Sequence, residues 1–285
     1  MNIIDTSAGM LTAYELHQFD IEKWKIYIDA SLPGVKQLCL DDMKKCIEAG
    51  CSWKEDYLPV LNNVYLEAEK RREAAASFHR VTDHLNEKIN SVFGRTVDVD
   101  IALYLGLCNG AGWVTAVCGR PVILLGIEKI VELNWCSIDD MNGLILHETG
   151  HVYHAQYGRW EREFPLPSDR FLWQLFVEGI AMVFEQRIIG NPEYFHQDKN
   201  GWKAWCDAHV EVIVQSFCRD LETMSFENQR YFGDWVSFDG HPDVGYYLGA
   251  RFIRFILESE SFDRVINYKI CEVRAAFQSF LGSLS

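Results

Sequence analysis

The sequence predicts a mostly helical α+β protein that contains one small antiparallel sheet. Most of the chain has apolar residues at helical spacing, whereas Val97, Val99, Ile101, Leu103 and Leu105 alternate with other residues. Strict alternation indicates a strand, because successive side chains of a strand point to opposite faces. Two further apolar runs flank a turn-like segment soon afterwards, which predicts a hairpin. A few strands within a mainly helical chain define the α+β class.

Residues 1–93 are predicted to form an N-terminal helical region, and residues 94–285 a second domain. Pro59 suits the first turn of a long helix, because its fixed φ angle is already helical. Apolar positions from Val64 to Ile89 then follow a helical period. Gly94 is expected to end this helix.

The predicted hairpin follows the alternating strand. Its arms, residues 113–117 and 122–125, flank Cys118-Gly119-Arg120-Pro121, which has the composition of a turn. Beyond Val131 the chain returns to helical spacing, with longer loops expected at 158–169 and 224–240.

Composition excludes several classes of partner. The 285 residues include 27 Lys and Arg against 41 Asp and Glu, a net charge of −14 that disfavours binding to nucleic acid or to anionic membranes. No apolar run is long enough to span a bilayer, and the N-terminus lacks the features of a signal peptide. Nine cysteines without a CxxC pair suggest free thiols and a cytoplasmic location.

A metal-binding motif lies in the first long helical stretch after the hairpin. Residues 147–151 read HETGH, the HExxH pattern, and Ser137 with Asp140 forms a capping box ahead of it. Residues i and i+4 of a helix share a face, so His147 and His151 can bind one tetrahedral zinc. Glu148 then lies beside the metal, where water needs a general base. The alternative is two helix-face histidines with ordinary packing partners.

A catalytic zinc also needs a third protein ligand. His154 shares the helical face with His147, although a histidine with structural partners is the alternative there. Glu178 is the acid at the centre of the apolar run 171–185, where an unpaired carboxylate is costly. An ion pair with an arginine is the alternative for Glu178. Gly179 beside it would allow another helix to approach closely.

HETGH followed by FVEGIA resembles the gluzincin metallopeptidases, in which a Glu-Gly helix supplies the third zinc ligand. The resemblance implies a zincin-like catalytic core with one zinc ion per chain, bound by His147, His151 and Glu178. Residues 113–255 are also similar to a bacterial family of predicted zinc-dependent proteases of unknown function. The gap between His151 and Glu178 is longer than in the best-known gluzincins, which implies an inserted loop. Met182 stands where many gluzincins have an acid that orients a zinc histidine.

A glycine-tyrosine helix near the C-terminus adds candidate catalytic residues. Gly245 and Gly249 lie four residues apart and make a flat stripe for helix packing. A tyrosine hydroxyl can stabilise the oxyanion of peptide hydrolysis, so Tyr246 is the first candidate, followed by Tyr247 and His241. The alternative is that the tyrosines are packed aromatics with structural hydrogen bonds.

The resemblance further implies an edge strand that pairs with extended substrate. Gly112, Trp113 and Val114 occupy this place in the chain order, and peptides add to sheet edges through main-chain hydrogen bonds. Residues 109–116 contain no acid that could hold a substrate amine, which argues against aminopeptidase activity.

Together these residues predict a cytoplasmic zinc metallopeptidase whose substrates are oligopeptides. Glu148 accepts a proton from zinc-activated water and passes it to the leaving amine. The sequence does not indicate an oligomeric state. Two alternatives remain: a zinc hydrolase of another amide or ester, and a non-catalytic binding protein on a zincin fold. The intact Glu148 argues against the second, since binding alone needs no general base.

Overall fold

The computed structural model describes residues 1–233 and 235–283. The chain divides into two compact units, Met1–Glu148 and Thr149–Ser285, and the division falls inside the continuous helix α7 (Ile138–Tyr157). The expected domain boundary after residue 93 stays a prediction.

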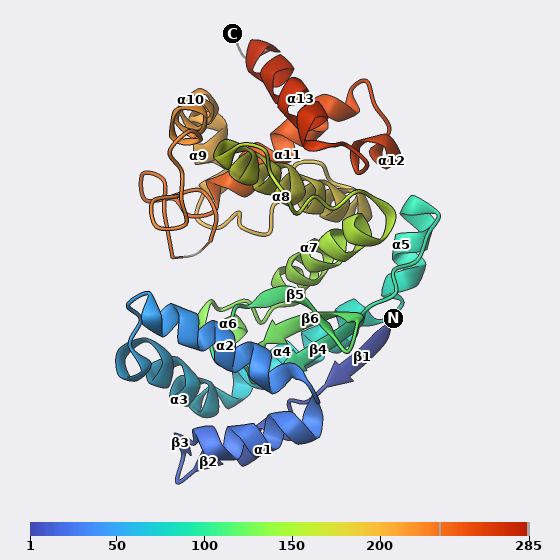
Figure 1. Cartoon of the computed structure of the whole chain (residues 1–285). Helices are drawn as coiled ribbons and strands as arrows, with labels where there is room; N and C mark the ends of the chain where they lie inside the picture. The colour runs from blue at the N-terminus through green and yellow to red at the C-terminus, as the bar shows by residue number, and fades with distance from the viewer. Residues whose placement is uncertain (234, 284–285) are drawn as a thin grey trace. The chain divides into compact units, whose positions relative to one another are not determined.

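The first unit combines helices with two sheets (Figure 1). In chain order its elements are β1 (Asn2–Asp5), a 3-10 helix (Met10–Ala13), β2 (Tyr14–Glu15), β3 (Gln18–Phe19), α1 (Ile21–Ser31), α2 (Val35–Glu48), a π-helical turn (Trp53–Tyr57), α3 (Leu58–Leu66), α4 (Ala68–Thr82), α5 (Leu85–Phe93), β4 (Asp100–Tyr104), β5 (Gly112–Val117), β6 (Arg120–Gly126), α6 (Ile127–Glu132) and the first part of α7.

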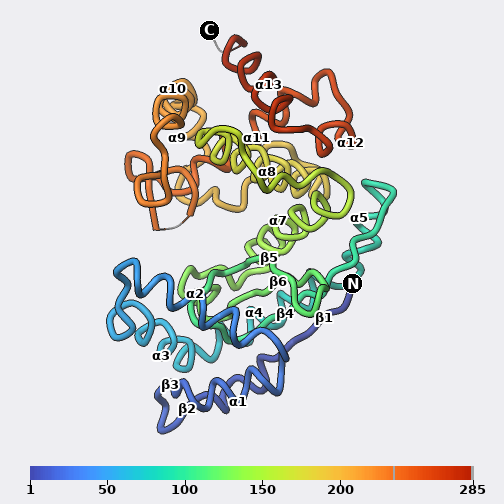
Figure 2. The backbone as a smooth tube through the Cα atoms, viewed as in Figure 1, coloured from blue at the N-terminus to red at the C-terminus, as the bar shows by residue number. Residues whose placement is uncertain are grey.

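The main sheet is mixed, which corrects the expectation of an antiparallel sheet. Its strand order is β1-β4-β6-β5, and only β5 runs antiparallel to its neighbour. Figure 2 shows β1, at the blue end of the chain, beside β4. Parallel neighbours need a long crossover, and the helical segment between β1 and β4 supplies it. Strand β1 was not predicted, because four residues are too few to show an alternating pattern in a region that otherwise reads as helical.

The predicted hairpin of β5 and β6 is confirmed. Cys118 and Gly119 both have positive φ angles, 52° and 79°, as a two-residue type I′ turn requires. Among the described strands β5 pairs only with β6, so it is an edge strand of the sheet.

The long helix predicted from Pro59 is instead three helices. The chain leaves helical geometry at Glu67, between α3 and α4, and at Asp83 and His84, between α4 and α5. Gly94 ends α5 with a φ of 68°, as expected for a C-terminal glycine.

The loop after β4 is held by a buried acid of α6. Glu128 accepts hydrogen bonds from the backbone N–H groups of Gly106 (2.9 Å) and Cys108 (3.0 Å). Burial raises the pKa of Glu128 to about 7. These bonds fix the path of the chain from β4 towards β5.

The second unit is helical and is organised around α8, with α11 and α13 packed against it. Its elements are the remainder of α7, α8 (Pro167–Ile189), α9 (Trp202–Ala208), α10 (Val210–Asp220), α11 (Val244–Leu257), α12 (Phe262–Val265) and α13 (Ile270–Ser283). A Cβ atom on Gly179 of α8 would lie 2.3 Å from the carbonyl oxygen of Gly249 on α11. The two glycines therefore permit the close helix contact that the sequence predicted for each of them.

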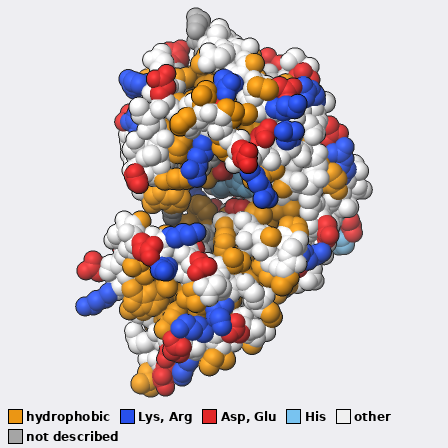
Figure 3. Space-filling model, viewed as in Figure 1, with side chains coloured by type: hydrophobic (Ala, Val, Ile, Leu, Met, Phe, Trp, Pro, Cys, Tyr) orange, Lys and Arg blue, Asp and Glu red, His pale blue; other side chains and the backbone are white. Residues whose placement is uncertain are grey.

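The surface carries charges of both signs. On the face drawn in Figure 3, Lys and Arg side chains are interspersed with Asp and Glu side chains, although the whole chain has a net charge of −14. Among the helices formed by residues 1–233 and 235–283, none has the length and apolar character needed to cross a bilayer. The nine cysteines are free thiols in the structure.

Candidate metal centre

The HETGH motif lies on α7, as predicted. Ser137 caps this helix by accepting a hydrogen bond from the backbone N–H of Asp140 (3.2 Å), and its hydroxyl donates to the Asp140 carboxylate (2.7 Å). Because α7 is unbroken, its own hydrogen bonds fix His147 and Glu148 relative to His151. The two imidazoles therefore project from one face of one rigid element.

Helix α8 crosses α7 at a pair of small residues. A Cβ atom on Gly150 would lie 2.9 Å from the Cα atom of Ala181, so the glycine of HETGH lets the two backbones come close. Three residues before Ala181 on α8 is Glu178, whose Oε2 lies 3.2 Å from Nε2 of His151. Burial at this crossing thus brings an acid to the histidine face.

One group of potential ligands contains the three residues predicted to bind metal. Ligand atoms of His147, His151 and Glu178 all lie within 4.8 Å of one another. His147 is 5% exposed, and the side chains of His151 and Glu178 are each 15% exposed. Two imidazoles and one carboxylate with limited solvent access are the donor set of a catalytic zinc site, so these residues fit the metal.

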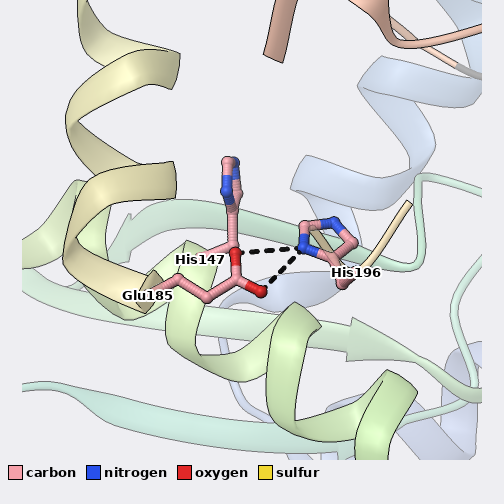
Figure 4. Close-up of side chains that lie close together, drawn as sticks. All are labelled: His147, Glu185 and His196. Atoms are coloured by element: carbon pink, nitrogen blue, oxygen red, sulfur yellow. Dashed lines mark hydrogen bonds and ion pairs between the residues drawn. The ribbon is translucent and has the colours of Figure 1, made fainter. Parts of the chain in front are cut away.

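A second group shares His147. Its other members are Glu185, four residues after Ala181 on α8, and His196, in the loop after α8. Figure 4 shows these side chains together, with the His196 ring beside the Glu185 carboxylate. Nδ1 of His196 lies 3.0 Å from each carboxylate oxygen of Glu185. Sequence reasoning missed both residues.

The two groups differ in which histidines they contain. Glu178 shares a group with both His147 and His151, whereas Glu185 shares a group with His147 alone. A tetrahedral ion bound by the HExxH pair would need a third donor near both imidazoles, and of these two acids Glu178 is the one grouped with both. The i to i+7 spacing of Glu178 and Glu185, which puts both acids on one face of α8, was a signal for Glu185 in the sequence.

The candidate base, Glu148, lies beside the edge strand β5. A Cβ atom on Gly112 would lie 3.0 Å from Cγ and 3.1 Å from Oε1 of Glu148. Glycine is therefore the residue that lets this strand approach the carboxylate. Of its neighbours in β5, Trp113 donates a hydrogen bond from Nε1 to the hydroxyl of Tyr104 (3.0 Å), and Val114 is 37% exposed.

The candidate oxyanion donors occupy different settings. The hydroxyl of Tyr247, which is buried, donates to Oδ1 of Asp207 (2.7 Å) and accepts from Arg251 (3.3 Å). Burial raises the pKa of this hydroxyl. Tyr246 is partly exposed and meets Phe232 edge to face, with ring centroids 6.0 Å apart. His241 stacks on Trp205 at a centroid distance of 3.7 Å. The role of Tyr246 stays a prediction, and Tyr247 already has a structural partner.

Two other titratable residues near the motif, His154 and Asp169, have structural partners. His154 is fully buried, and its Nε2 lies 3.1 Å from the carbonyl oxygen of Ile266, the geometry of an N–H donor to that acceptor. Asp169 accepts the backbone N–H of Leu166 at the start of α8 and pairs with Arg274 at 2.7 Å. Asp169 therefore caps the start of α8 and forms an ion pair with Arg274.

Comparisons with known proteins do not add to this geometry. No model of a protein family, no curated protein and no solved structure matches the chain. The resemblance to gluzincins therefore stays a prediction that rests on the sequence motifs.

Proposed function

We propose that this chain is a zinc-dependent peptidase that hydrolyses oligopeptides bound in an extended conformation. The observation that carries the proposal is the convergence of His147, His151 and Glu178 within 4.8 Å on two crossing helices. Non-catalytic proteins have no need of the further carboxylate, Glu148, on the same helix. A zinc ion in this site supplies Lewis acidity towards a carbonyl oxygen and lowers the pKa of water.

Residues of the chain itself would carry out the proton transfers and bind the substrate. Glu148 accepts a proton from the attacking water and delivers it to the leaving amine, which is the task of a general base that then acts as a general acid. The open edge of β5 offers main-chain donors and acceptors to an extended peptide. Since Gly112 in this strand approaches Glu148 closely, a peptide bond aligned along β5 would lie near the base.

The test combines metal content with turnover. Purified protein should contain about one zinc per chain and should cleave members of a mixed peptide library. Glu148→Gln should keep zinc and fold but lose activity by roughly 10²–10⁴-fold, because an amide cannot accept the proton. Zinc without peptide cleavage, but with hydrolysis of simple amides or esters, would favour the alternative hydrolase. Zinc without any turnover would favour a binding protein.

A further inference from the structure

We infer that Glu185 and His196 form a positioning pair that orients His147 for metal binding. The inference rests on the proposed zinc site. It concerns the acid and the second histidine in Figure 4, Glu185 and His196, which share a group with His147. A histidine that binds metal through one ring nitrogen almost always donates a hydrogen bond from the other, commonly to a carboxylate.

The crossing brings a carboxylate oxygen of Glu185 within 4.8 Å of a ring nitrogen of His147. Glu178 precedes Ala181 by three residues and lies at His151, whereas Glu185 follows Ala181 by four and lies in the group of His147. The two helices therefore run antiparallel, and each histidine of HETGH has its own acid on α8. Met182, which lies between these acids on the same helix face, has no carboxylate to offer.

Glu185 is buried, so its carboxylate needs hydrogen-bond partners within the protein. The residue is 0% exposed, and a buried carboxylate is strongly destabilising unless hydrogen-bonded or paired. His196, whose side chain is 8% exposed, is the donor to both carboxylate oxygens. A carboxylate has about four lone-pair positions, so Glu185 can also accept from a ring nitrogen of His147.

The loop that carries His196 is fastened on both sides of it. Gln186 of α8 donates to the carbonyl oxygen of Tyr194 (2.9 Å), and Gln197 donates to the sulfur of Met182 (3.8 Å). Between them Phe195 is buried and packs on Trp202, with ring centroids 5.8 Å apart. These contacts place the His196 ring at Glu185 rather than leaving it to a mobile loop.

The experiment measures zinc affinity, by competition with a chromophoric chelator, in wild type, Glu185→Gln and His196→Gln. Asp169→Asn is the matched control, because it removes another buried carboxylate of α8 that is paired with a cation, Arg274. Glu185→Gln should weaken zinc binding by about 10–100-fold and His196→Gln by about tenfold, with Asp169→Asn within about threefold of wild type. The visible absorption spectrum of the cobalt-substituted protein should shift in the first two variants alone.

Each result bears on a separate conclusion. If wild type binds no zinc, the proposed function fails. If wild type binds one zinc and both Glu185→Gln and His196→Gln match it in affinity and cobalt spectrum, the positioning pair is wrong and the zinc site stands. Two metal ions in wild type, with one lost in His196→Gln, would make Glu185 and His196 ligands themselves and would also overturn the inference. Should Glu185→Gln not fold, His196→Gln alone decides, since it leaves the carboxylate in place.

Discussion

Acidic residues on the same helix can have different roles, depending on the residues that they contact. Asp169 and Glu178 are both acids on α8, yet Asp169 caps the helix and pairs with Arg274, whereas Glu178 faces His151. A Ser-Asp pair before an apolar run is typical of a helix start, which explains Asp169 from the local sequence. An acid in mid-helix has no such local explanation, and its partner must come from another element.

Glu178→Gln should weaken zinc binding by more than about 100-fold, the upper range for residues that only support a ligand. The amide keeps the shape of the side chain but loses the negative charge that attracts the cation. A zinc titration of Glu178→Gln beside Asp169→Asn makes the comparison. Unchanged affinity in the first variant together with a loss in the second would exclude Glu178 as the ligand.

His154 predicts a pH dependence of stability. Burial lowers the pKa of His154 from its usual value of 6.5 to about 4, and the nearby His151 contributes a smaller part of this decrease. The unfolded chain therefore takes up a proton at higher pH than the folded chain does, so stability present above pH 6.5 is lost as the pH falls towards 4. The loss attributable to this residue is about 3 kcal/mol at pH 4.

His154→Gln provides the comparison, since glutamine can still donate to the Ile266 carbonyl but does not titrate. The free energy of unfolding is measured by urea at pH 7.5 and pH 4 with a chelator present, so that other histidines contribute equally to both proteins. Wild type should lose about 3 kcal/mol more than the variant across this interval. Equal losses would show that the His154 ring is not held neutral.

At the scale of elements, β5 can approach α7 closely only because residue 112 is glycine. An added methyl group would meet Glu148 and Leu144, both on α7. Gly112→Ala should therefore displace the carboxylate of Glu148 and lower kcat/KM by roughly 10–100-fold, because small misplacements of catalytic groups are costly. Zinc content should not change. Gly282→Ala, at a helical glycine with open space around it, is the control. Full activity in Gly112→Ala would mean that Glu148 tolerates the displacement.

Elements with short-range sequence signals could be predicted from the sequence, whereas features that depend on contacts between distant parts of the chain could not. The β5–β6 hairpin and the HETGH helix were predicted because alternation, turn residues and capping are short-range signals. The parallel pairing of β1 with β4 was not predicted, since residues 2–5 and residues 100–103 are far apart in the chain and no local pattern indicates that they pair. His196 was missed for the same reason. It lies in a loop without a motif, and its position depends on contacts with α8.

At the scale of the whole molecule, metal binding should be linked to folding. The three candidate ligands come from two helices, and an unfolded chain does not bring them together. Zinc at 100 times its Kd should then raise the free energy of unfolding by roughly 2.7 kcal/mol. The nine free cysteines can bind zinc in the unfolded chain and reduce this value, so the comparison among variants is the measurement that matters.

Urea unfolding with and without zinc should separate the ligand from the base. His151→Ala should lose the zinc-dependent increase in stability, because two remaining donors do not make a strong site. Glu148→Gln should retain the full increase, because the base lies beside the metal without binding it. Both substitutions abolish turnover under the proposed mechanism, so activity alone cannot tell them apart, whereas stability can. An equal zinc-dependent increase in His151→Ala and wild type would place the stabilising ion elsewhere in the chain and remove His151 from the site.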